Sequence, residues 1–257
     1  MKVIRIIFAE FKMNLLAAFS YKFGIISDII VFGILQVLLF FGDTGSSLSN
    51  TYVSGNSKEL LLIGYIAWVL SCACITTIGG EIKHELMSGT FYHKMKAKVP
   101  ISVLYIGKLL AALLMQIITI VSLLAISFFL FKIKIDFNPF IVLNLMVCMI
   151  GMYGLGLIVA GFAVIYKQIN SLVFIIELIL LFVSDVLTKN DSLQFLVNII
   201  PLSYCNDLSR KSISNTPILP FDLLKYIILC SVLLVIGIFV FNSMLKSARK
   251  KGNLLQF

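Results

Sequence analysis

Residues 109–131 read LLAALLMQIITIVSLLAISFFLF, a run without a charged side chain. A helix needs about 20 mostly apolar residues to cross a bilayer, and this run supplies them. Five further stretches share this character: Phe23–Phe41, Leu60–Gly79, Phe140–Tyr166, Leu172–Leu187 and Leu223–Leu245. Because the runs are continuous and do not alternate in polarity, they predict an all-α polytopic membrane protein with six transmembrane helices.

The composition supports this prediction. Apolar residues make up 60% of the 257 positions and charged residues 13%, whereas soluble domains have about 45–50% and about 25%. The net charge of +9 would suggest nucleic-acid binding in a soluble protein, but here the basic residues lie between apolar runs. We therefore expect one transmembrane domain over residues 1–257, a bilayer around it, no nucleic acid as a partner and no soluble enzyme.

The basic residues also predict an orientation. If the N-terminus is cytoplasmic, about two thirds of the 21 lysines and arginines fall in cytoplasmic segments, as the positive-inside rule requires. Both termini are then cytoplasmic, and Cys205 lies on the extracellular side, where a thiol reagent should reach it. Met1–Lys22 interleaves charged and apolar residues, so it does not resemble a cleavable signal peptide.

Two segments outside the six runs have helical or apolar patterns of their own. In residues 1–22, apolar side chains recur at helical spacing while Lys2, Arg5 and Lys12 occupy another face. This pattern predicts an amphipathic interfacial helix, the alternative being a simple extension of the first span. In the extracellular segment 188–222, the apolar residues 192–200 are too few to span. They predict a short re-entrant or interfacial helix before the last span.

Two enzymatic motifs are incomplete. His84-Glu85 begins like a zinc-protease helix, but Ser88 stands where the second histidine is needed. Gly107-Lys108 is followed by Leu109, and Ser102 replaces the first glycine of a phosphate-binding loop. We therefore expect no catalytic residue, no metal site and no ATPase site in this chain.

Polar residues inside the apolar runs are candidates for function, because charge in lipid is costly. Asp28 and Gln36 lie in the first run, and Glu177 lies near the middle of the fifth. We predict a translocation path from these three, although Asp28 is close enough to a span end to be hydrated. Glu177 could equally pair with a polar group across a helix interface. Gly156 and Ala160 form a small-xxx-small pair that permits close helix packing.

The region from residue 81 to the start of the third run, which includes the loop 81–100, carries four spaced features. Glu85 stands four residues before Gly89-Thr90, Pro100 follows, and Gly107-Lys108 opens the third run. A second set lies before the last run: Pro201-Leu202-Ser203-Tyr204 and then Arg210. In this order the motifs resemble those of the ABC-2 type permeases of bacterial ATP-driven exporters.

The resemblance implies a fold, partners and a location. The loop 81–100 would dock on a separate ABC ATPase, and a helix through Glu85 would end at Gly89, where glycine can adopt a left-handed turn. The expected docking residues are Glu81, His84, Glu85, Gly89, Thr90, Phe91 and Met95. ATP and Mg²⁺ would bind the partner, and this chain would hold no cofactor.

A complete transporter of this kind would contain two ATPases and two permeases, identical or related, in the cytoplasmic membrane of a bacterium. The expected substrate is an amphipathic or hydrophobic molecule, such as an antimicrobial or toxin peptide or a drug. The alternatives are a polysaccharide or lipid exporter of the same family, and a secondary transporter or channel.

Overall fold

The computed structural model describes residues 2–20, 22–42, 48, 51–52, 57–91, 94, 96, 100–133, 138–166, 169–187 and 199–250. Within these ranges the regular structure is helical, which confirms the predicted all-α class. The elements are α1 (Lys2–Ser20), α2 (Lys22–Phe41), α4 (Ser57–Met87), α6 (Ile101–Phe131), α7 (Pro139–Tyr166), α8 (Asn170–Val183), α10 (Pro201–Ile213) and α11 (Pro220–Lys250).

Five of these helices, α2, α4, α6, α7 and α11, are long and apolar enough to cross a membrane. The fifth predicted run, Leu172–Leu187, gives a shorter helix than expected, because α8 has 14 residues and ends at Val183. At a rise of about 1.5 Å per residue it is roughly 21 Å long, less than the hydrocarbon thickness. Asp185 stops it by adopting a left-handed conformation with φ 54°.

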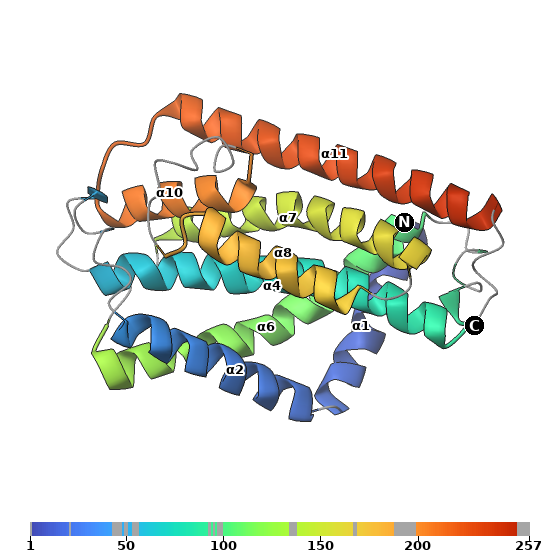
Figure 1. Cartoon of the computed structure of the whole chain (residues 1–257), viewed down its shortest axis with the longest axis horizontal. Helices are drawn as coiled ribbons and strands as arrows, with labels where there is room; N and C mark the ends of the chain where they lie inside the picture. Colours follow the sequence, from blue (N-terminus) through green and yellow to red (C-terminus); the bar gives the residue numbers. More distant parts are fainter. Residues whose placement is uncertain are drawn as a thin grey trace.

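Helix α4 forms the centre of the bundle. In its most apolar window 89% of the residues are buried inside the protein, against 17% for α2 and for α11. Figure 1 shows α7 and α11 on one side of α4, α2 and α6 on the other, and α10 at the end opposite to α1. A helix that is apolar on all sides is placed in this way because each of its faces finds an apolar neighbour.

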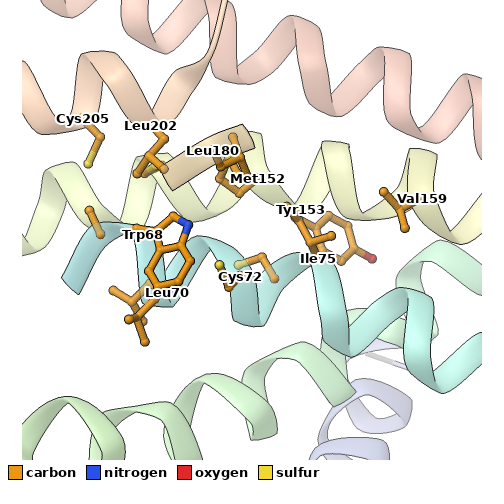
Figure 2. Close-up of a cluster of buried hydrophobic side chains, with 14 of the residues drawn as sticks. Trp68, Leu70, Cys72, Ile75, Met152, Tyr153, Val159, Leu180, Leu202 and Cys205 are labelled. Carbon is orange, nitrogen blue, oxygen red and sulfur yellow. The ribbon is translucent and has the colours of Figure 1, made fainter. Parts of the chain in front are cut away.

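Glycines set the close packing on the α7 side. A side chain at Gly237 of α11 would collide with the Gly154 carbonyl of α7, so the two backbones touch. Gly156 of α7 faces α4, where an added Cβ would lie 2.7 Å from the Cys74 carbonyl oxygen, which confirms the close approach predicted at this position. Figure 2 shows buried side chains of α4 and α7 around this contact, among them Cys72, Ile75, Met152, Tyr153 and Val159.

The N-terminal stretch is a separate helix, as predicted, and α1 packs against α6. Gly107 makes the contact possible, because an added Cβ would lie 2.6 Å from the Ile7 carbonyl oxygen. Ile4, Phe8 and Met13 remain largely exposed on its other side. This distribution suits a helix with one face in lipid, and its position at a membrane interface stays a prediction.

The short helix predicted at residues 192–200 falls mostly outside the described residues. The helix observed before the last span, α10, begins at Pro201, where proline suits the first helical turn. Cys205 lies within α10 with no exposed surface, because its sulfur and carbonyl oxygen contact Asn144 of α7. The expectation that a thiol reagent reaches Cys205 is therefore wrong for the folded protein.

Candidate functional site

A buried carboxylate joins the end of α4 to the start of α6. Glu85 is 4% exposed, and its carboxylate accepts hydrogen bonds from Lys94 Nζ at 2.6 Å, Lys108 Nζ at 2.7 Å and the Tyr105 hydroxyl at 2.5 Å. Charge-assisted bonds of this kind are about twice as strong as neutral ones. Three donors on one carboxylate thus offset the cost of burying its charge.

The cluster extends to two more acidic residues. Lys108 also forms an ion pair with Glu81, one turn before Glu85 on α4. Lys94, in the loop after α4, lies 3.7 Å from the Glu10 carboxylate of α1. We call these residues the Glu85 cluster: Glu10, Glu81, Glu85, Lys94, Tyr105 and Lys108. It ties together α1, α4, the following loop and α6.

The turn after α4 is built as the sequence predicted. The helix ends at Met87, and Gly89 adopts φ 71°, a left-handed conformation that glycine takes without steric cost. The hydroxyls of Ser88 and Thr90 lie 3.3 Å and 3.5 Å from the Glu85 carbonyl oxygen, which α4 leaves without a helical partner. The turn therefore fixes the chain direction immediately beside the Glu85 cluster.

The predicted docking residues divide into two groups. His84, Gly89 and Thr90 are exposed and Glu81 is half-buried. Glu85 and Phe91 are buried, so neither presents its side chain to a partner. Met95 lies outside the described residues. The exposed group can form a docking surface, while Glu85 holds the segments behind that surface together.

Four members of the Glu85 cluster were not predicted as site residues: Glu10, Lys94, Tyr105 and Lys108. The sequence analysis used Lys94 only as one of the basic residues that predict orientation, and Lys108 also as part of the Gly107-Lys108 motif. Spacing could have identified part of the cluster, because Glu81 and Glu85 stand four apart on one helix and Tyr105 and Lys108 three apart on the next. Glu10 lies too far along the chain for any spacing rule to find it.

A second buried charge lies near the other end of α4. Arg210 of α10 is fully buried, and its guanidinium donates to the carbonyl oxygens of Leu60 at 3.1 Å, Asp185 at 2.6 Å and Val186 at 2.8 Å. Gly64 leaves room for it, since an added Cβ would lie 2.6 Å from the guanidinium. Burial lowers the pKa of Arg210, although arginine starts so high that it remains charged.

A cavity opens between α1, α2, α4, α6 and α8, with a volume of about 450 Å³. Asp28 of α2 and Glu177 of α8 both line it, so the structure brings together two of the three residues predicted for the translocation path. Gln36 is not among the lining residues. It is fully buried between α2 and α6, where it bonds to Ser127 and to the Leu123 carbonyl oxygen.

Within the described ranges, no group of three or more His, Cys, Asp or Glu side chains is arranged to hold a metal ion. The geometry instead combines a charged cluster beside an exposed turn with a cavity of polar and apolar lining.

A comparison with protein families finds a match to the ABC-2 type transporter family over residues 3–213, most of the chain. No curated protein sequence matches the chain.

Proposed function

The chain belongs to the ABC-2 type transporter family, and from this premise we propose that it is the permease subunit of an exporter that a separate ATPase drives. Family membership makes it a multi-pass membrane subunit of an ABC transporter. The outward direction of transport, the substrate and the composition of the complex are the content of the proposal.

The observation that carries the proposal is the Glu85 cluster. A partner that pushes on the turn at Ser88–Thr90 would act on the end of α4, because that turn continues the helix. The same push would reach α6 through the bonds of Glu85 to Tyr105 and Lys108. Through Lys94 it would reach α1. Since α4 runs through the centre of the bundle, motion of its end would change the packing along its length.

The docking surface is formed by the exposed residues of the same end. His84, Met87, Ser88, Gly89 and Thr90 offer polar and apolar contacts to a protein partner. Two ATPases, each carrying ATP and Mg²⁺, would bind the turns of two permeases. ATP-driven closure of the ATPases would then move both turns together and switch access to a path between the permeases.

The cavity would serve as the entrance to this path on each permease. Helices α4 and α6, which carry most residues of the Glu85 cluster, line the cavity. Helices α2 and α8 line it as well. Its lining is mostly apolar with a few polar groups, which suits an amphipathic peptide or drug. Such a substrate could enter from lipid, because α2 and α8 are largely exposed on their outer faces.

Co-purification tests the proposal. The chain, with an affinity tag, should retain an ABC ATPase encoded in the same organism and form a complex of two permeases and two ATPases in nanodiscs. The mass of the complex can be measured directly. The isolated permease should not hydrolyse ATP, whereas the complex should hydrolyse it and export substrate from proteoliposomes.

A matched pair of variants sharpens this test. Thr90→Lys changes the exposed turn, while Asp222→Asn changes a charged residue at the start of α11, near the opposite end of the bundle. The first should reduce retention of the ATPase and the second should not. Transport by the permease without any ATPase would contradict the proposal and identify a secondary carrier.

A further inference from the structure

The cavity has an acidic lining. Its charged lining residues are Asp28 and Glu177, and its uncharged polar residues include Thr76, Thr77 and Gln116. None of the described residues that line it is a lysine or an arginine. Among the described lining residues, a ligand in this space therefore faces two carboxylates and no cation.

Glu177 is held in place through its backbone. Trp68 Nε1 of α4 donates a hydrogen bond to the Glu177 carbonyl oxygen at 2.9 Å, which fixes this turn of α8 against α4. The side-chain oxygen Oε1 of Glu177 is buried and has no hydrogen-bond partner among the described residues. A buried acceptor without a partner costs free energy, so a donor from a bound molecule would improve the site.

The remaining lining is apolar. Ile25, Phe32, Val69 and Met115 contribute side chains from α2, α4 and α6. The volume of about 450 Å³ lies within the range of drug-sized binding sites, about 300–1,000 Å³. An uncharged apolar ligand would leave both carboxylates without a partner, and an anion would be repelled by them.

We propose that this cavity binds the cationic part of an amphipathic substrate, with Glu177 and Asp28 opposite the positive charge and the apolar side chains around its body. The inference rests on the proposed transport function and adds the charge of the substrate to it. It also assigns different tasks to the two carboxylates. Glu177, which is half-buried with a fully buried Oε1, is the inner partner of the cation, and Asp28, which is exposed on α2, attracts it at the entrance.

Two probes of one shape and opposite charge test the proposal. Tetraphenylphosphonium is a lipophilic cation, and tetraphenylborate is an anion of the same shape. Binding of each is measured by equilibrium dialysis against the permease in nanodiscs, with empty nanodiscs subtracted as the lipid background. We expect saturable, permease-dependent binding of the cation and none of the anion.

Three variants locate the binding. Glu177→Gln and Asp28→Asn keep the shape of each side chain and remove its charge, and each should weaken cation binding about tenfold. Asp222→Asn makes the same chemical change outside the cavity and should leave binding unchanged. If Glu177→Gln fails to fold, Asp28→Asn still tests the site, because its side chain is exposed and not needed for packing.

Equal cation binding by the parent and both cavity variants would overturn the proposal, and so would equal binding of the anion or no binding of the cation. Retention of the ATPase is measured on the same samples. A complex that keeps its ATPase but does not bind the cation refutes the charge assignment alone. Cation binding by a permease that retains no ATPase refutes the proposed exporter and leaves the cation site standing.

Discussion

The two ends of α4 hold buried charge in different ways. At its first turns, Arg210 is bonded to backbone carbonyl groups of α4 and of the segment after α8. About 37 Å away along the helix, Glu85 is bonded to side chains of the following loop and of α6. At the Arg210 end a side chain bonds to backbone carbonyl groups, whereas at the Glu85 end side chains bond to one another.

This difference suggests different mechanical roles. Backbone carbonyl groups cannot turn away without disrupting the chain that carries them, so the Arg210 contacts fix the arrangement of α4, α8 and α10. Lysine side chains are long and flexible, and they can follow a moving carboxylate or exchange it for Glu81 or Glu10. The Glu85 end can therefore change shape while remaining paired, as a segment that transmits motion must.

The largest effect on stability should come from removing Arg210, which fixes the first turns of α4. Arg210→Ala would leave three buried carbonyl oxygens without their donor, at a cost of about 1–3 kcal/mol each. We expect a loss of at least about 3 kcal/mol, seen as poor yield and a lower melting temperature in detergent. Arg249→Ala, an exposed arginine near the end of α11, serves as the control and should behave like the parent.

A smaller effect should come from separating α1 from the Glu85 end. Gly107→Val would place a branched side chain against the backbone of α1 at Ile7, and overpacking of this kind costs about 1–3 kcal/mol. Gly80→Val adds the same side chain to α4 at a position with open space. Limited proteolysis should release α1 faster in the first variant only. Equal protection of α1 in both would show that this contact does not hold it.

The sequence predicted the helical class, five of the spans, the separate N-terminal helix and the Gly89 turn. Each of these depends on local composition or on one residue's conformational preference. It did not predict that Glu85 is buried, because the partners of Glu85 on α6 and in the loop are set by how the helices pack. For the same reason the sequence did not predict that Cys205 is buried against α7 or that Gln36 bonds to α6 outside the cavity. The length of α8 was overestimated because Leu180–Leu187 is apolar throughout except at Ser184 and Asp185, which end the helix.

The smallest effect on stability should come from the exposed turn. Thr90→Ala removes a side chain at the surface, and such changes usually alter the free energy of unfolding by less than about 0.5 kcal/mol. The melting temperature should stay at the parent value, while the affinity for the ATPase falls. Titration of the ATPase onto the permease in nanodiscs measures this. A parallel loss of stability and affinity would mean that Thr90 supports the fold and does not contact the partner.

The central claim is that the Glu85 cluster transmits the motion of the ATPase into the permease, and Glu85→Gln tests it most directly. This change keeps the shape of the side chain and removes the charge that Lys94 and Lys108 pair with. A spin label on a cysteine placed at Phe182, an exposed position of α8, reports the distance between the two permeases of one complex. With the parent permease, ATP and vanadate should shift this distance. With Glu85→Gln, the ATPase should still bind, but the distance should remain at its value without ATP. The same ATP-dependent shift in both proteins would contradict the account.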